Sequence, residues 1–209
     1  MKKLILILAL GLPALVPAFS QNYSIHGGPM AELYYFGIKG GLTLSTIRAE
    51  RAQDRAASPL AGYTLGCHIG TSPFSVIPIS FETGLSLTQK GGRQNIDGKV
   101  DRKMVFLDLP LLVKYNWALD DMVSIHPYAG AFLALALDGY DKNYALQKKL
   151  NLWKNYKHFD SGLKVGVCAS YAFAFLDAGF EFGLFDINNR TEYAHARSSC
   201  FYLALGINF

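Results

Sequence analysis

The stretch CFYLALGINF, Cys200 to Phe209, closes the sequence and repeats with a period of two. Bulky apolar side chains occupy alternate positions, at Phe201, Leu203, Leu205, Ile207 and Phe209. The residues between them are small or polar, except for one tyrosine. This alternation is typical of a β-strand, because successive side chains of a strand point to opposite faces. The stretch therefore predicts a strand with one apolar face, and it raises the question of which medium that face contacts.

Seven further segments alternate in the same way, at 36–45, 63–70, 79–88, 107–115, 128–138, 162–167 and 176–184. The links between consecutive strands alternate in length. Long links lie at 47–61, 91–103, 139–158 and 187–198, and short links lie at 72–77, 118–121 and 172–174. An antiparallel meander with this spacing has its long loops at one end, the long-loop end, and its tight turns at the other, the short-turn end. That asymmetry is characteristic of outer-membrane barrels.

Alternation alone does not decide which face points inward, because soluble and membrane barrels share it. An eight-stranded barrel has an interior that is only wide enough to be filled by side chains. The Leu, Phe and Ile residues of the apolar faces would overfill it, whereas the opposite faces carry mainly Gly, Ser, Thr and Ala. A soluble barrel would also carry more Lys and Glu outside. We therefore expect an all-β protein, an eight-stranded antiparallel up-and-down transmembrane β-barrel whose apolar faces contact lipid.

The inward faces carry charged residues at Lys39, Glu82, Asp108, Lys114, Lys164, Asp177 and Glu181. A buried unpaired charge is costly, so we expect these side chains to form one mixed hydrogen-bonded network that plugs the lumen. Two interpretations remain open. The charges either only keep the lumen polar, or they form a gated path for protons or ions.

Aromatic residues gather near both expected rims of the barrel. Those near the short-turn end are Tyr34, Tyr35, Phe36, Tyr115, Trp117, Tyr171 and Phe173. Those near the long-loop end are Tyr63, Phe106, Phe159, Phe185 and Phe201. Rings with a polar edge suit the level of the lipid headgroups, so the sequence predicts two aromatic belts.

The first twenty residues have the features of a signal peptide. Lys2 and Lys3 precede an apolar run at 4–12, and Ala18 and Ser20 have the spacing of a cleavage site. A membrane anchor is the alternative, but the run is shorter than the roughly 20 residues that a span needs. We therefore expect a cleaved signal peptide at 1–20, a short N-terminal segment at 21–35 and the barrel at 36–209.

The long links are basic, although the net charge of the whole chain is only +4. They hold 14 Lys and Arg residues against six Asp and Glu, and the fifth link contains Lys148, Lys149, Lys154 and Lys157. These lysines either form a solvated surface or contact anionic lipopolysaccharide or another polyanion. An exported barrel is not expected to bind nucleic acid.

Metal binding and catalysis are not expected. Cys67, Cys168 and Cys200 are widely spaced and form no CxxC motif, which argues against a disulfide framework or a zinc site, and no cofactor is predicted. Acyl chemistry would need a nucleophile, a base and an orienting group in contact. His126 has no evident serine and carboxylate partners in the sequence. The other histidines are His26, His68, His158 and His195, and the serines near His158 and His195 are Ser161, Ser198 and Ser199. A lipid hydrolase or acyltransferase and a small porin-like channel remain the alternatives to a structural or interaction role.

Several stretches carry a family resemblance that runs from the first strand to the last: GIKGGLTLS at Gly37–Ser45, FETGLSLTQKGG at Phe81–Gly92, FLDLPLLVKY at Phe106–Tyr115, HPYAGAFLAL at His126–Leu135, DSGLKVG at Asp160–Gly166, DAGFEFGL at Asp177–Leu184 and the closing YLALGINF. On these stretches the chain resembles the PorT-like outer-membrane β-barrel proteins of Gram-negative bacteria. The link at 139–158 has no counterpart in that pattern.

The resemblance implies residence in the bacterial outer membrane after export through the inner membrane. It also implies that the barrel-insertion machinery reads the final strand, with Phe209, Ile207 and Leu205 as the insertion signal. From the barrel and its basic loops we expect a structural or interaction role, as a surface platform of loops for polysaccharide, lipid or a protein partner. Because a member of the family assists protein secretion, the resemblance adds secretion-system or envelope proteins as candidate partners.

Overall fold

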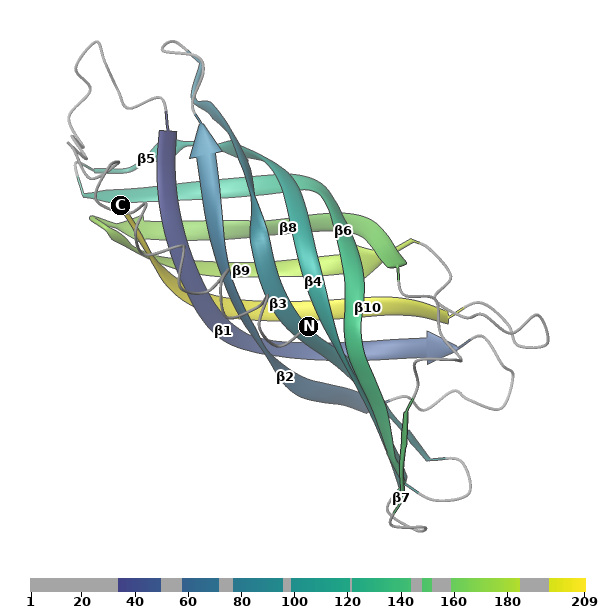
Figure 1. Ribbon diagram of the computed structural model, residues 1–209. Helices are drawn as coiled ribbons and strands as arrows, with labels where there is room; N and C mark the ends of the chain where they lie inside the picture. Colours follow the sequence, from purple (N-terminus) through teal and green to yellow (C-terminus); the bar gives the residue numbers. More distant parts are fainter. Residues whose placement is uncertain are drawn as a thin grey trace, which may run out of the picture.

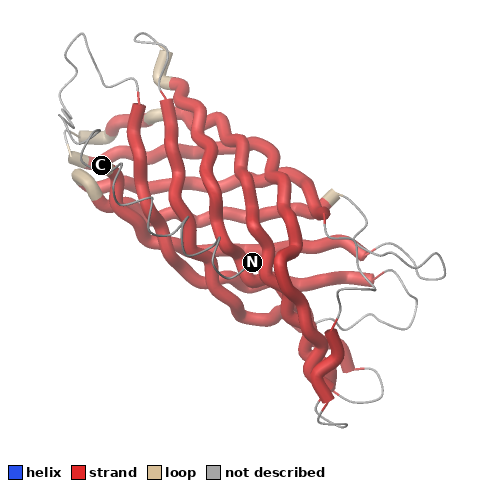
Figure 2. Tube along the Cα trace, in the orientation of Figure 1, coloured by secondary structure: helices blue, strands red, loops and turns tan. Residues whose placement is uncertain are grey.

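The computed structural model describes residues 34–49, 58–71, 77–95, 99–120, 122–143, 148–151, 159–184 and 196–209. Most of these residues lie in strands that wrap into one closed antiparallel barrel (Figures 1 and 2). The eight long strands are β1 (Tyr34–Ala49), β2 (Ser58–Thr71), β3 (Ile79–Asn95), β4 (Lys99–Tyr115), β6 (Val123–Asn143), β8 (Phe159–Tyr171), β9 (Ala174–Gly183) and β10 (Ala196–Asn208). Two short strands, β5 (Trp117–Ala118) and β7 (Lys148–Asn151), pair with β6. The predicted fold class is confirmed.

The barrel closes where the first strand meets the last. β1 pairs with β2 on one side and with β10 on the other, and β4 pairs with β6 across one of the short turns. The paired residues can be followed from Phe36 once around the barrel, through Ile69, Thr83, Leu111, Ala131, Leu163, Phe182 and Ser199. The path returns to β1 at Thr46, ten residues beyond its start.

This offset sets the tilt of the strands and the width of the barrel. The offset along the strands is ten residues of about 3.3 Å, and the distance across them is eight spacings of about 4.8 Å. The ratio of these two lengths corresponds to a strand tilt of about 40° from the barrel axis. Figure 1 shows the strands crossing the long axis obliquely. A barrel of this size has an interior that side chains fill.

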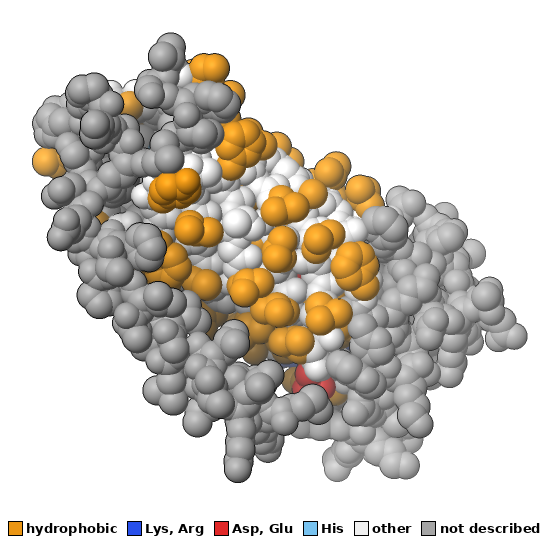
Figure 3. Space-filling model, turned by 45° about the horizontal axis from the view of Figure 1, so that its top comes forward, with side chains coloured by type: hydrophobic (Ala, Val, Ile, Leu, Met, Phe, Trp, Pro, Cys, Tyr) orange, Lys and Arg blue, Asp and Glu red, His pale blue; other side chains and the backbone are white. Residues whose placement is uncertain are grey.

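The apolar faces point outward, as the sequence predicts. On β10, Leu205 is 68% exposed, whereas its neighbour Ala204 is 1% exposed. On β1 the contrast between Leu42 and Thr43 is 72% against 1%. Figure 3 shows apolar side chains spread over the part of the outer wall that is visible between the grey segments. An apolar surface of this extent is unfavourable in water and is typical of a wall that contacts lipid.

Exposed rings mark the rim at the short-turn end. They belong to Tyr34, Tyr115, Trp117, Tyr171, Phe173 and Phe209, each at least 43% exposed. Toward the other end the exposed rings are Tyr63, Phe159, Phe182 and Phe201. Tyr35 and Phe106 do not join these belts, because both occupy inward positions of their strands, and Phe106 is fully buried. Phe185 lies outside the described residues.

The strands at the long-loop end are longer than predicted, so the four links expected at 47–61, 91–103, 139–158 and 187–198 are wrong in extent. β3 and β4 remain paired as far as Asn95 and Lys99, and β6 continues to Asn143 and pairs there with β7. Beyond the apolar belt both faces of a strand are hydrated, so these segments lose the alternation from which strands are read. In Figure 1 this extension projects beyond the other strands at the lower right.

Within the described segments, no helix has the length and apolar character needed to cross a membrane.

Candidate functional site: the charged lumen and its mouth

All seven predicted charged residues lie inside the barrel. Lys39, Glu82, Asp108, Lys114, Lys164, Asp177 and Glu181 are between 1% and 7% exposed. Their inward direction follows from the period of two, because each shares a face with small residues and alternates with exposed apolar ones. The structure distributes them over three levels of the lumen.

The middle level joins four strands. Lys39 Nζ on β1 lies 2.7 Å from Asp177 Oδ2 on β9. Tyr128 on β6 donates its hydroxyl hydrogen to Asp177 Oδ1 at 2.6 Å, and it also contacts the hydroxyl of Tyr202 on β10. Asp177 therefore receives partners from two separate parts of the wall.

Glycines make room for these two tyrosines. Gly166 on β8 and Gly179 on β9 are paired and face the lumen. A Cβ atom at Gly179 would lie 2.5 Å from the hydroxyl oxygens of both Tyr128 and Tyr202. The glycine at this position therefore reflects the close approach of lumen side chains, and no phosphate-binding loop is needed to explain it.

The level nearer the long-loop end is centred on Glu181. Its Oε1 pairs with Lys164 Nζ at 2.7 Å, and its Oε2 lies 2.8 Å from Lys90 Nζ. Lys90 also lies 3.4 Å from Asp108 Oδ1. Because Lys90 belongs to β3 and Glu181 to β9, this ion pair crosses the lumen.

Sequence reasoning missed Lys90 because it placed the end of the third strand near residue 88. Ser86, Thr88 and Lys90 share the inward face, so the alternation would have revealed the lysine if it had been extended. The Lys90 ammonium also lies over the rings of Phe132 and Phe106, at 4.5 Å and 5.3 Å from their centroids. These cation–π contacts offset part of the cost of removing the charge from water.

The level nearer the short-turn end is centred on Glu82. The carboxylate pairs with Lys114, and its Oε2 accepts a hydrogen bond of 3.0 Å from the hydroxyl of Tyr35. His68 lies beside this pair and shares a 3.0 Å hydrogen bond with the side chain of Asn208.

Asp160 is a second lumen residue that sequence reasoning missed. It is fully buried on β8 and accepts a hydrogen bond of 2.6 Å from the hydroxyl of Ser198. Among the described residues, its other carboxylate oxygen has no hydrogen-bond partner. Asp160 lies on the same strand face as Lys164, so the alternation again could have revealed it.

A separate hydrogen-bonded group, here called the mouth cluster, lies near the short-turn end. It consists of Ser80, Asn116, Ser124, His126 and Ser170. His126 Nε2 lies 2.6 Å from Ser170 Oγ, and its Nδ1 lies 3.0 Å from Asn116 Oδ1. The expectation that His126 lacks a serine partner is therefore wrong. The two residues are 44 positions apart in sequence, and only the β6–β8 register brings them together.

The other histidines considered for catalysis do not form such a group in the described part of the chain. His26, His158 and His195 lie outside the described residues. Ser198 is buried in the lumen and bound to Asp160, whereas Ser161 is buried on the opposite face of β8, which it shares with Leu163.

No group of three or more metal-binding side chains occurs among the described residues. Cys67, Cys168 and Cys200 are all free.

The remaining predicted sites are the lysines of the link at 139–158 and the apolar residues of the final strand. Lys154 and Lys157 lie outside the described residues, and for Lys148 and Lys149 only the backbone of β7 is described. Phe209 exchanges backbone hydrogen bonds with Phe36, at 2.7 Å and 3.4 Å. Leu205 is exposed and Ile207 is half-buried on the same outward face.

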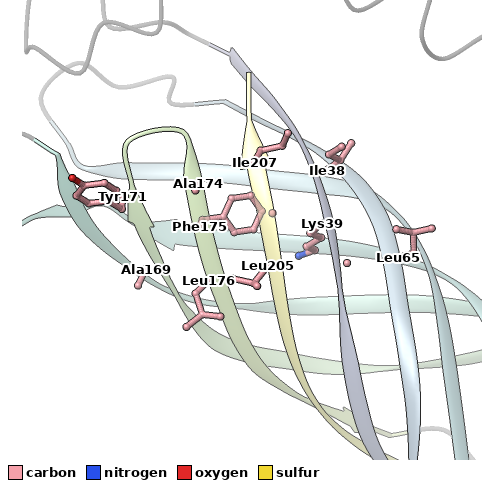
Figure 4. A pocket seen from close by; sticks show the side chains of 12 residues that line it. Ile38, Lys39, Leu65, Ala169, Tyr171, Ala174, Phe175, Leu176, Leu205 and Ile207 are labelled. Atoms are coloured by element: carbon pink, nitrogen blue, oxygen red, sulfur yellow. The ribbon is translucent and has the colours of Figure 1, made fainter.

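A shallow groove of about 620 Å³ lies on the outer wall over the seam between β1 and β10 (Figure 4). Ile38, Leu65, Leu176, Leu205 and Ile207 are among the apolar residues that line it. The groove is thus part of the apolar outer surface, in contrast to the ionic lumen behind it.

Comparison with known proteins gives a family and a fold. A family model described as "Outer membrane protein beta-barrel domain" matches residues 19–189. A comparison with curated protein sequences gave no significant match. The chain is similar in structure to three solved barrels, with TM-scores below 0.5.

The first is Neisserial surface protein A, with 16% identity, a TM-score of 0.47, and coverage of 83% of this chain and 97% of that chain. The second is OprG from Pseudomonas aeruginosa, with 13% identity, a TM-score of 0.49, and coverage of 84% and 95%. The third is the attachment invasion locus protein Ail of Yersinia pestis, with 12% identity, a TM-score of 0.45, and coverage of 85% and 100%.

Proposed function

The chain belongs to the outer membrane protein β-barrel domain family and resides in the bacterial outer membrane, and from this premise we propose that it is a closed, non-conducting barrel with a structural or interaction role. In this proposal the barrel is a stable support for its long-loop end. Partners would be surface polysaccharide, lipid, or a protein of secretion or envelope assembly. PorT-like membership in particular, and cleavage of residues 1–20 as a signal peptide, are parts of the same proposal.

The observation that carries the proposal is the set of buried ion pairs in the lumen. Lys90–Glu181 crosses the lumen from β3 to β9, and Lys39–Asp177 joins β1 to β9 over the intervening strand β10. Beside Lys90, a buried apolar cluster of Met104, Phe106, Phe132, Ala134 and Ala136 lines the wall formed by β4 and β6. Ions crossing the barrel would have to break buried charge pairs, which is costly in a medium of low dielectric constant.

Planar-bilayer recording tests the closed state. We expect no steady conductance steps from the purified protein. The double variant Lys90→Ala/Glu181→Ala removes the pair that crosses the lumen, and we expect it to conduct if it folds. Leu203→Ala, which removes bulk only from the outer face, is the matched control. Regular ohmic steps from the unaltered protein would contradict the closed barrel and favour the porin-like channel.

The basic long links support an electrostatic interaction with anionic lipopolysaccharide at the outer leaflet. The triple variant Lys148→Glu/Lys149→Glu/Lys154→Glu tests it, because it reverses three charges in one link. We expect weaker binding of lipopolysaccharide to the barrel in vesicles, and a weaker dependence of binding on salt. The triple arginine variant at the same positions keeps the charge and should bind normally. Equal binding by all three proteins would leave these lysines as a solvated surface.

A protein partner is tested by crosslinking in intact outer membranes, followed by purification of the barrel. Deletion of residues 152–158 provides the control, since it shortens one long link and leaves the described strands in place. We expect a partner of the loops to be recovered with the full chain and lost with the deletion. Recovery of the same proteins from both would place the contact outside residues 152–158.

A further inference from the structure

The mouth cluster contains a serine, a histidine and an asparagine in the connected order that nucleophilic serine sites use. It contains none of the seven charged lumen residues, and it does not contribute to the closed-barrel proposal. We propose that it is a nucleophilic site for a carboxylic ester, with Ser170 as the nucleophile, His126 as the general base and Asn116 as the residue that positions His126.

The hydrogen bonds assign the proton positions. Asn116 Oδ1 accepts a hydrogen bond of 3.1 Å from Ser80 Oγ, and a carbonyl oxygen can only accept. His126 Nδ1 must therefore carry the hydrogen that it shares with Asn116 Oδ1 at 3.0 Å. Its Nε2 is left with a lone pair, which accepts the hydroxyl hydrogen of Ser170 at 2.6 Å. This is the tautomer that a general base requires.

Local structure holds the three residues in place. Ser170 lies two residues before Ala172, whose φ of 51° makes the tight turn between β8 and β9. Asn116 lies between β4 and β5, directly before Trp117. His126 is supplied by β6, whose register with β8 pairs Cys168 with His126 and Ser170 with Ser124. Two turns and a strand thus fix a contact that no local sequence motif contains.

The position of the cluster favours an ester as the substrate. Ser170 lies at the level of Tyr171, and Asn116 at the level of Trp117, which are 63% and 58% exposed in the rim of aromatic rings at the short-turn end. Tyr171 points outward and Ser170 points into the lumen, so an ester would reach the cluster through the mouth of the barrel. Aromatic rims mark the level of lipid headgroups, where the ester bonds of glycerolipids lie. Ser170 is 6% exposed and His126 is half-buried, so the cluster is sheltered without being sealed in the core.

The proposed reaction has two balanced steps. Ser170 Oγ bonds to the ester carbonyl carbon while its hydrogen passes to His126 Nε2. The bond from that carbon to the alcohol oxygen then breaks, and the alcohol leaves with the hydrogen from His126. In the second step water attacks the acyl-serine ester, gives one hydrogen to His126, and releases the carboxylic acid as Ser170 recovers its hydrogen.

Neighbouring groups set the surroundings of this reaction. Ser124 Oγ lies 3.3 Å from Ser170 Oγ and is a further hydroxyl beside the nucleophile. The charged groups nearest in effect to the imidazole are Lys114 and Glu82, and these two form an ion pair with each other. The orienting partner of His126 is Asn116, in the role that a carboxylate fills in many serine sites.

A fluorophosphonate probe that labels activated serines tests the site in the folded, detergent-solubilised full chain. We expect covalent labelling, and tandem mass spectrometry should place the label on Ser170. Ser170→Ala should abolish labelling, and His126→Gln should lower its rate by about 10²- to 10⁴-fold because the general base is lost. Asn116→Ala should give a smaller loss, whereas Asn116→Asp should retain most of the rate and shift its pH profile.

Ser86→Ala is the matched control, because Ser86 is also an inward serine that is 6% exposed. A gel-mobility shift on heating shows that each variant is folded. Two substrates distinguish the sources of the ester: p-nitrophenyl acetate in water and a phospholipid in vesicles. Release of acid from the phospholipid alone assigns the site to lipid, and release from the acetate alone assigns it to soluble esters. Absence of label on Ser170 in the folded, unaltered protein would overturn the proposal.

Discussion

The two faces of the barrel wall follow different rules. The outer face is uniform, since residues such as Leu42, Leu65 and Leu205 repeat the same chemistry from strand to strand. The inner face is a set of individual contacts, in which Lys39 meets Asp177 and Lys90 meets Glu181. Each outer residue therefore only has to suit the surrounding medium, whereas each charged inner residue also has to match a partner. Substitutions on the two faces should fail in correspondingly different ways.

The largest effect is expected inside, at Glu181. Glu181→Ala leaves both Lys90 and Lys164 buried without their shared carboxylate, and removal of one partner from a buried pair costs about 3–5 kcal/mol. Urea unfolding of the barrel in lipid vesicles measures this loss. Phe180→Ala, on the adjacent outward position, is the control and should cost much less. Equal losses of unfolding free energy for Glu181→Ala and Phe180→Ala would contradict the different sensitivity expected of the inner and outer faces.

A charge placed on the outer face should have the next largest effect. Leu203 is 45% exposed in the middle of β10, and Leu203→Lys brings an ammonium group to the hydrocarbon region. Such substitutions cost about 2–4 kcal/mol near the membrane midplane. The same unfolding measurement applies, with Leu203→Val as the control. An unchanged free energy of unfolding would mean that this surface does not contact hydrocarbon.

A smaller effect is expected at Tyr128, where a single hydroxyl is removed. Tyr128→Phe keeps the ring and loses the hydrogen bond to Asp177, which still has Lys39 as a partner. A hydrogen bond to a charged group contributes about 1.5–3 kcal/mol, so the loss should lie at or below this range. The double variant with Lys39→Met then measures the coupling between the two contacts. Strict additivity would show that the middle level is not one network.

The smallest effect is expected at Asp160. Asp160→Asn retains an oxygen that accepts the hydrogen bond from Ser198, and it removes a charge that forms no ion pair within the described residues. We expect a change within about 1 kcal/mol of the original free energy of unfolding, in contrast to the loss at Glu181. A loss of several kcal/mol would indicate that a cation pairs with Asp160 in the membrane.

The difference between the faces also explains what the sequence could predict. Alternation predicts all eight long strands and the direction of each face, because it responds to the medium. The alternation is lost where the medium changes, so it predicts an end of the third strand that is too early and a start of the fourth that is too late, and it misses Lys90. The seven charged residues could be placed in the lumen by their position in the alternation alone.

Their partners could not be predicted. Lys39 and Asp177 are 138 positions apart, and they meet only because the path around the barrel is offset by ten residues. A different offset would give Asp177 another partner with the same strands. The contact between His126 and Ser170 depends on the β6–β8 register in the same way, which is why no sequence motif announced it.

The hydrogen bonds between Phe36 and Phe209 belong to the pairing that closes the sheet, and this pairing bears on how the barrel folds. Until β1 pairs with β10, the sheet has two unpaired strand edges. Unpaired edges aggregate readily, and contacts between distant residues form slowly. Both edges disappear in the same event, so the wall is protected against edge-to-edge association only once β1 and β10 have paired.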